Sequence, residues 1–258
     1  MGILSTPPEE HYHEPARDVS WTAFMDIVES RRSVRVFDST PIPDEVVRKC
    51  LCASLLTASS SNLQPWEFYW VKSPAAKEAL VKACLSHPPA ATAQTLIVCV
   101  ARTHTWRKTR DHILETFHRA SREDVHGVSR STFDYYEKIV PFVYNQGPLG
   151  IFSPFKKLLY FALGFFRPVP RAPASPNDMK VWAVKSTALA AQTLMLAFRA
   201  SGFDSCPMEG LDSTRVKKLL NLPRDATVVM VLGAGKRAPN GVYGPRLRCD
   251  DKQFIHEI

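Results

Sequence analysis

Residues 30–37, SRRSVRVF, place three arginines and two serines among apolar residues, and no acidic side chain follows until Asp38. A helical face that points into solvent usually carries acids to balance such a cluster. Guanidinium groups suit phosphate because their forked N–H donors match its oxygens. The segment follows a predicted helix and precedes a turn, where backbone N–H groups are free. The pattern therefore predicts an anion site.

Two further segments are dense in hydrogen-bonding groups. Residues 58–66, ASSSNLQPW, hold three consecutive serines, an asparagine and a glutamine. Such a set of hydroxyls and amides suits a polyhydroxyl chain or the edge of a heterocycle. Residues 206–210, CPMEG, are typical of a short loop whose glycine lets backbone N–H groups approach a ligand closely. Each segment alone is equally consistent with a capped turn.

Helices and strands must position these segments. Amphipathic spacing and capping residues predict helices at about 20–32, 43–58, 77–85, 178–202 and 213–223. Aromatic and β-branched runs predict buried strands at 67–71, 95–101 and 226–235. The longest helix places small residues on its surface, where another helix could approach closely, at Ala183, Ala188, Ala190 and Ala191. The tail from 236 to 258 shows no regular pattern.

Length and composition limit the class of protein. With 258 residues and 45% hydrophobic content, the chain can bury one sizeable core, and we expect a single domain over 1–258. The six cysteines lack metal-type pairing and several lie in apolar runs, which predicts reduced, buried thiols. The N-terminal residues show no secretory pattern, so we expect a cytoplasmic protein. The longest strongly apolar run, 158–166, is about half a bilayer-spanning length, so no transmembrane segment is expected.

Residues 103–177 interrupt the regular pattern. They are rich in Arg, Lys, Tyr and Phe and end in a proline-rich linker. A structureless loop of this length is unusual in a compact domain, so we expect an insertion that forms helices and covers a site as a lid. Its aromatic residues, including Trp106, Phe133, Tyr135 and Tyr136, are suited to stack on a planar acceptor.

Much of the net charge of +8 lies in this part of the chain, because residues 102–171 hold 12 basic and 6 acidic side chains. A local surplus of this kind argues against a general nucleic-acid-binding face, and we expect no nucleic-acid partner. Within it, residues 152–171 could form an amphipathic helix on an anionic surface. The plainer alternative is that this helix packs against the dimer, with Lys156 and Lys157 solvated.

Taken together and in this order, the three segments resemble the FMN-dependent nitroreductase family. RRSVRVF is similar to that family's Arg-x-Ser-x-Arg/Lys-x-Phe signature, ASSSNLQPW to its Pro-Ser-x-x-Asn-x-Gln-Pro-Trp segment, and CPMEG to its Pro-x-Glu-Gly loop. The likeness covers about 20–101 and 178–250. It implies an α+β fold, a nitroreductase-like α/β sandwich with a central, mostly antiparallel sheet flanked by helices, in an obligate homodimer.

The resemblance also implies which residues bind the cofactor FMN. Arg31 and Ser33 match positions at the phosphate and ribityl end, and Arg32 matches a backbone-contact position between them. Arg35 matches the basic residue beside the flavin pyrimidine edge, and Arg246 matches a phosphate contact near the C-terminus.

The other matched positions lie in the second and third segments. Ser59, Ser60 and Asn62 match residues that reach the flavin of the partner chain, and Gln64 belongs to the same motif. The loop over the isoalloxazine is matched by Met208, Glu209 and Gly210. No catalytic side chain and no metal ligand are expected.

The implied activity is that of an FMN-dependent oxidoreductase. It would use NAD(P)H to reduce an aromatic acceptor of nitroaromatic or quinone type by a ping-pong mechanism, since the flavin carries the redox chemistry and the protein supplies position and charge. Some relatives contact the substrate from the segment matched by 84–94, where this sequence differs, so acceptor preference is not inherited. The alternatives are reductive dehalogenation or flavin cleavage on the same fold, or a basic protein that binds anionic surfaces.

Overall fold

The structure is a computed structural model that describes residues 15–122 and 130–258. Most of the N-terminal segment examined for a secretory pattern, and part of the predicted insertion, lie outside these ranges.

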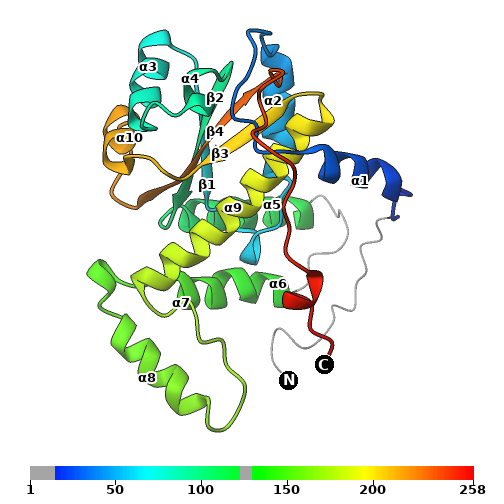
Figure 1. The fold of residues 1–258 in the computed structure, drawn as a ribbon. Coiled ribbons are helices and arrows are strands. Elements are labelled where there is room, and N and C mark those ends of the chain that lie inside the picture. Colours follow the sequence, from blue (N-terminus) through cyan, green and yellow to red (C-terminus); the bar gives the residue numbers. More distant parts are fainter. Residues whose placement is uncertain (1–14, 123–129) are drawn as a thin grey trace.

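Four strands form one antiparallel sheet in the order β1-β2-β4-β3 (Figure 1). Three of them match the predicted strands: β1 (Trp66–Val71), β2 (Thr95–Arg102) and β4 (Ala226–Gly235). The fourth, β3 (Asp204–Met208), corrects the prediction that CPMEG is wholly a loop. The prediction of a loop rested on Pro207, because a proline is unfavourable inside a sheet. It is accepted here because β3 is an edge strand. The antiparallel sheet of the predicted fold class is confirmed.

Strand β2 is buried on both faces of the sheet. Leu96, Val98 and Val100 pack in the core cluster of one face, while Ile97 belongs to the cluster of the opposite face. Because side chains of a strand alternate between faces, a strand covered on both sides needs apolar residues at every position. This explains the continuous run TLIVCVA.

Helices cover both faces of this sheet. On one face, α9 (Pro176–Ala200) and α2 (Asp44–Leu55) bring Phe198, Leu194 and Val47 against Ile97 and Leu232. The other face is covered by α3 (Pro74–Ala83), α4 (Pro88–Ala91) and α10 (Ser213–Leu219). The first helix, α1 (Trp21–Ser30), begins where Ser20 accepts a hydrogen bond from the backbone of Ala23. The five predicted helices are therefore confirmed, and helices flank the sheet as expected.

By length and composition alone, α9 is long and apolar enough to cross a membrane, but half of its most apolar window is buried inside the protein. It contacts all four strands and α2, as the core helix of a globular fold does. Of its small residues, Ala183, Ala190 and Ala191 are fully buried, so other parts of the same chain pack closely on the helix at these positions. The exposed apolar residues of α9 are instead Val181 and Leu189.

The described part of residues 103–177 is mainly helical, as predicted. Its helices are α5 (Trp106–Arg122), α6 (Arg130–Asp134), α7 (Val140–Tyr144) and α8 (Ser153–Leu163), with a π-helical turn (Tyr135–Ile139) between α6 and α7. Trp106 and Tyr136 are buried in a core shared with Met179 and Trp182 of α9. These two aromatics therefore pack inside the chain and are not exposed as a lid would require, and α5 to α7 belong to the body of the fold.

An ion-pair network joins the ends of β1, β2 and β4. Arg102 Nε lies 3.0 Å from Asp225 Oδ2, and Arg102 also pairs with Glu67. Burial opposes ionisation of Asp225, but hydrogen bonds from Arg102 and the charge of that side chain hold the pKa of the carboxyl below its ordinary value. The network therefore stabilises the fold while Asp225 is ionised.

We expect Asp225→Asn to lower the free energy of unfolding by about 3 kcal/mol at neutral pH, because it removes one partner of a buried pair. A depressed carboxyl pKa stabilises the fold above the unfolded-state value of about 3.9, and this stabilisation is lost as the pH falls through the folded-state pKa. Urea unfolding of the wild type and of the Asp225→Asn variant should therefore give a difference in the free energy of unfolding that becomes smaller below about pH 4. The matched control is Asp44→Asn, which removes an exposed pair with Lys72 and should have little effect. A difference that is constant with pH would contradict this account.

Candidate functional site

The arginine segment lies between the end of α1 and the C-terminal tail. Arg31, Arg32, Ser33 and Arg35 line a pocket of about 300 Å³ together with residues 242–248. The sequence prediction that Arg246 belongs with these residues agrees with this arrangement.

Backbone pairing with the edge strand β3 holds this segment in place. Ser33 forms a parallel bridge with Ser205, and the backbone N–H of Val34 donates to the Ser205 carbonyl at 3.1 Å. Val34 and Phe37 are buried, and Phe37 packs so closely on Gly235 that a Cβ there would lie 2.8 Å from the Phe37 Cβ. With the apolar residues anchored inside, Arg35 points to the exposed side.

Two guanidinium groups of this pocket donate to backbone carbonyls and not to acids. Arg32 Nη2 donates to the Gly244 carbonyl at 2.6 Å, and Arg246 Nη2 donates to the carbonyls of Glu29 at 2.7 Å and Arg31 at 2.6 Å. Among the described residues, no carboxylate forms an ion pair with the arginines of this pocket.

The arginines elsewhere on this side of the sheet are paired differently. Arg199 and Arg237 both bind the buried carboxylate of Asp204, at 2.9 and 2.7 Å. In the pocket, by contrast, burial and the nearby charges of Arg246, Arg248 and Arg32 lower the pKa of Arg31. The pocket therefore holds several guanidinium cations close together. Their forked N–H donors match the oxygens of a phosphate group.

The middle of β3 lies beside Arg35. Arg35 Nη1 is 3.5 Å from Cys206 Sγ, and burial raises the pKa of the Cys206 thiol while Arg35 opposes that rise. Met208 is buried in the core, so its side chain is not available to a ligand. Glu209 and Gly210 are exposed, and a Cβ at Gly210 would meet no atom within 4 Å. The predicted loop thus opens next to the arginine pocket.

The serine-rich segment forms a tight turn elsewhere in the chain. Ser61, Asn62 and Gln64 have φ angles of 56°, 49° and 47°, a left-handed conformation that is unfavourable for residues other than glycine. Ser59 Oγ accepts from the Gln64 backbone N–H at 3.0 Å, and Gln64 Nε2 donates to Asn62 Oδ1 at 3.2 Å. Several strained residues in one turn are characteristic of binding sites.

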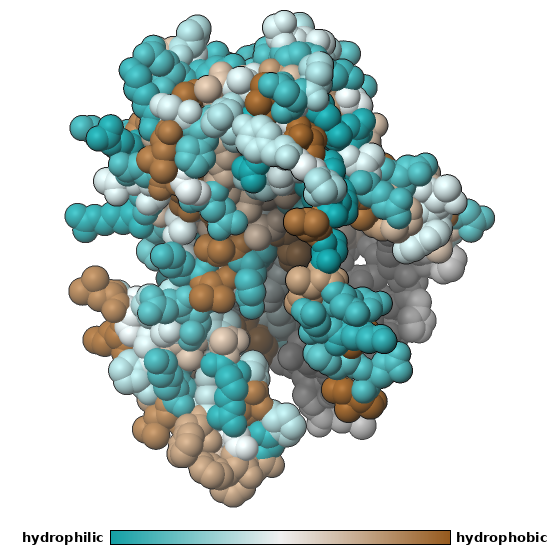
Figure 2. Space-filling view, viewed as in Figure 1, coloured by the Kyte–Doolittle hydropathy of each residue, from teal (hydrophilic) through white to brown (hydrophobic). Residues whose placement is uncertain are grey.

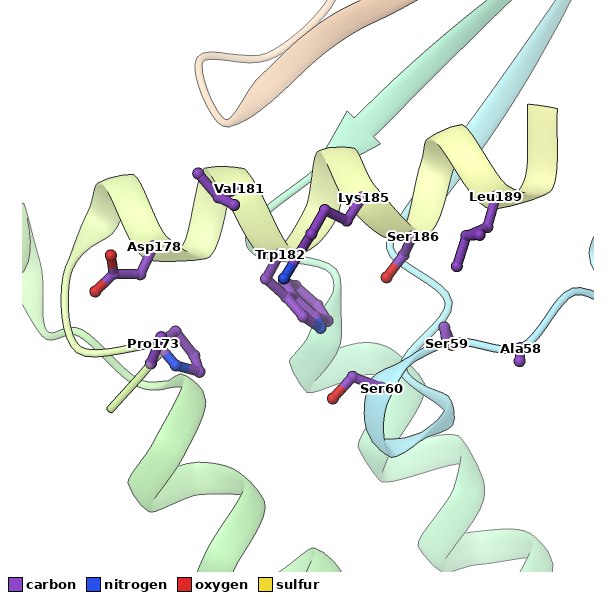
Figure 3. A pocket seen from close by; sticks show the side chains of 11 residues that line it. Ala58, Ser59, Ser60, Pro173, Asp178, Val181, Trp182, Lys185, Ser186 and Leu189 are labelled. Carbon is purple, nitrogen blue, oxygen red and sulfur yellow. The ribbon is translucent and has the colours of Figure 1, made fainter. Parts of the chain in front are cut away.

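This turn borders a second, larger cavity of about 520 Å³. Figure 3 shows Trp182 pointing from α9 toward the segment that carries Ser59 and Ser60, with Lys185 beside it. The Trp182 Nε1 donor is buried and has no hydrogen-bond partner among the described residues. Nothing in the sequence singled out Trp182, because its helical spacing is that of a core residue.

Tyrosines of the 103–177 segment fix the serine turn. Tyr144 Oη lies 3.0 Å from Ser60 Oγ, and Tyr135 Oη lies 2.6 Å from Ser61 Oγ. Tyr136 Oη donates to the Ser61 carbonyl at 3.1 Å. The aromatic richness of the segment was visible in the sequence, but these tyrosines bind the protein's own backbone and hydroxyls.

The predicted site residues thus fall into two groups within one chain. The first group shares the arginine pocket and the adjacent end of β3: Arg31, Arg32, Ser33, Arg35, Met208, Glu209, Gly210 and Arg246. The second group is the serine turn, where Ser59 and Ser60 line the larger cavity and Asn62 and Gln64 complete the turn. No pocket described above contains residues of both groups.

The sequence of the chain is similar to those of known proteins. The model of the nitroreductase family matches residues 28–236. The chain is 26% identical over 248 residues to the chloronitrobenzene nitroreductase of Comamonas testosteroni, covering 90% of this chain and 96% of that protein. It is also 26% identical over 217 residues to an NADH dehydrogenase of Thermus thermophilus, covering 84% of this chain and 88% of that protein.

Solved structures share the fold. A nitroreductase-like protein from Streptococcus mutans matches with a TM-score of 0.68 at 21% identity, covering 93% of this chain and 100% of that one. A protein from Exiguobacterium sibiricum, solved in complex with FMN, matches with a TM-score of 0.65 at 22% identity, covering 95% and 99%.

Proposed function

The chain belongs to the nitroreductase family of NAD(P)H-dependent enzymes, and we propose that it binds FMN and uses NAD(P)H to reduce an aromatic acceptor of nitroaromatic or quinone type. The observation that carries the proposal is the pocket in which Arg31, Arg35 and Arg246 lie together without an acidic partner among the described residues. The FMN complex of the Exiguobacterium protein and the name of the Comamonas relative support the same cofactor and acceptor class.

The residues present fit FMN. Arg31, Arg32 and Arg246 supply the charged donors that a phosphate requires, and Ser33 adds a hydroxyl beside them. Arg35, which lines this pocket and lies beside Cys206 of β3, would stabilise negative charge on the pyrimidine edge. When bound, the flavin supplies the two-electron chemistry, while these side chains bind and orient it.

A complete site would need two chains. The serine turn and the arginine pocket lie in different pockets of one chain, and we propose that Ser59, Ser60 and Asn62 serve the flavin of a partner in a homodimer. Each chain would then give one half of each of two sites, which is the arrangement of an isologous interface. The exposed apolar residues Val181 and Leu189 of α9 lie next to the turn and are candidates for that interface.

Light scattering should accordingly report a dimer, and Leu189→Arg should shift it toward monomer with loss of bound FMN. The reason is that a buried, unpaired arginine in an interface is strongly unfavourable. Leu85→Arg is the control, because Leu85 is equally exposed but follows α3, on the opposite face of the sheet from α9. A stable monomer that retains FMN and activity would contradict the two-chain site.

We further propose that the whole chain is one domain into which residues 103–177 are inserted. Helices α5 and α7 share a core with α9, so this part holds the fold and the serine turn. Because all six cysteines are free thiols, four of them buried, the chain fits a reducing compartment such as the cytoplasm.

The proposed function is tested with the purified protein, NADH and NADPH, and a panel of nitroaromatic, quinone and halogenated aromatic acceptors. We expect visible flavin absorbance and acceptor-dependent oxidation of a nicotinamide. Turnover confined to halogenated acceptors would replace the proposal with reductive dehalogenation, and loss of flavin itself would replace it with flavin cleavage. A colourless protein that gains no absorbance with excess FMN would exclude a flavoenzyme.

A further inference from the structure

Helix α8 directs polar side chains inward and apolar ones outward. Its buried residues are Ser153, Lys156 and Tyr160, at helical spacing. Lys156 is only 3% exposed, and its Nζ donates to the carbonyls of Val143 at 2.9 Å and Asn145 at 2.6 Å. A surface helix of a globular protein normally turns its apolar stripe toward the core. The orientation of α8 is therefore inverted.

The outward side of α8 is a contiguous apolar surface. Phe155, Leu158, Phe161 and Phe165 are each at least 60% exposed, and their spacing places them on one side of the helix. Phe161 and Phe165 pack edge to face, with ring centroids 4.9 Å apart. We call these four residues and Phe166 the α8 apolar face. In Figure 2, hydrophobic atoms gather at the lower end of the molecule, where Figure 1 shows α8.

Two exposed basic side chains lie close to this face in the sequence. Residues 149–171 contain two lysines and two arginines but neither aspartate nor glutamate. Lys157 and Arg167 are exposed, and Arg171 Nη1 donates to the Tyr160 carbonyl at 2.8 Å, which ties the proline-rich linker to α8. Aromatic and leucine side chains on one face with lysine and arginine around them are the composition of a helix that lies in a membrane interface.

We propose that the α8 apolar face docks on the surface of an anionic lipid bilayer, with its aromatic side chains among the headgroups and its cations on lipid phosphates. The helix lies in the interface and does not span it, because 11 residues are about 16 Å long and the hydrocarbon core is about 30 Å thick. Lys156 holds α8 on α7, so the face is presented in a fixed orientation.

The charges favour lipid over a second copy of the chain. Two copies paired by this same face would bring Lys157 and Arg167 toward the same cations of the partner. Lys157 lies close enough to Asp178 of its own chain to lower the pKa of that carboxyl, while residues 149–171 contain no acid to offset Arg167. An anionic bilayer instead complements both the apolar residues and the cations. The proposal does not depend on the redox activity.

Co-sedimentation with vesicles tests the proposal. The wild-type protein should bind vesicles of phosphatidylcholine mixed with phosphatidylglycerol at least about tenfold more tightly than vesicles of phosphatidylcholine alone, and added salt should weaken the binding. The double variants Phe155→Ser/Phe161→Ser and Lys157→Glu/Arg167→Glu should each bind the anionic vesicles at least about tenfold more weakly. Since these side chains are exposed, thermal unfolding should be unchanged.

Two matched controls lie away from α8. Leu85→Ser removes an equally exposed leucine and Lys49→Glu reverses an exposed lysine, and both should bind like the wild type. The proposal is overturned if the wild type does not bind anionic vesicles, or if the α8 variants bind them as tightly as the controls do. It is also overturned if the Phe155→Ser/Phe161→Ser variant changes the oligomeric state by light scattering, because a second copy would then cover the face.

Discussion

Arg31→Ala is expected to raise the Kd for FMN by about 30-fold or more, because truncating one partner of a desolvated, hydrogen-bonded charge pair costs about 2–5 kcal/mol. The free energy of unfolding of the FMN-free protein should not decrease. Burial and the charges of neighbouring arginines already lower the pKa of Arg31, so its removal relieves repulsion in the empty pocket. Fluorescence titration of the FMN-free protein measures the affinity, and urea unfolding measures the stability.

The control for this experiment is Arg215→Ala. Arg215 is an exposed arginine that pairs with Asp212 at 3.1 Å on α10, outside the pocket. Its loss should change neither the affinity nor the free energy of unfolding by a measurable amount. If Arg31→Ala bound FMN as tightly as the control, the arginine pocket would not be the phosphate site.

Trp106→Ala is expected to lower the free energy of unfolding by about 3–5 kcal/mol, the usual cost of deleting a large buried aromatic. Trp106 is 2% exposed and lies against Tyr144, with ring centroids 6.2 Å apart. Because Tyr144 in turn binds Ser60, the substitution should also loosen the serine turn. Urea unfolding provides the measurement.

Phe155→Ala is the matched comparison, since Phe155 lies in the same 103–177 segment but is 65% exposed. It should cost less than about 0.5 kcal/mol. Similar small losses for both variants would mean that the segment does not support the fold and acts only as a cover. The same packing implies that a short linker in place of 105–174 would expose the core around Met179 and Trp182.

Local patterns were sufficient for most of the fold. The continuous apolar run of β2 follows from burial on both faces of the sheet, and the spacing in α9 follows from burial on one side of a helix. Strand β3 was missed because its apolar residues are few and Pro207 resembles a turn signal. The elements that cover Ala183 and Ala190 could not be predicted, because helical periodicity does not say which neighbour packs on a buried face.

The candidate site could likewise be predicted only in part. The arginine pocket could be predicted, because Arg31 and Arg35 stand in one short segment and the edge pairing of Ser33 keeps them together. The contact between Ser61 and Tyr135 could not, since 74 residues separate them and only tertiary packing joins them. Trp182 was missed because its position in the cavity beside the serine turn also depends on tertiary packing.

The separation of the site into two pockets has a genetic consequence. If each flavin lies between the arginine pocket of one chain and the serine turn of its partner, two different inactive variants should complement each other. In a mixed dimer of an Arg31→Ala chain and an Asn62→Ala chain, both defects fall in one site, and the other site receives an intact half from each chain. Co-expression of the two variants with different affinity tags should therefore yield mixed dimers that hold half of the wild-type flavin, whereas either variant alone holds little.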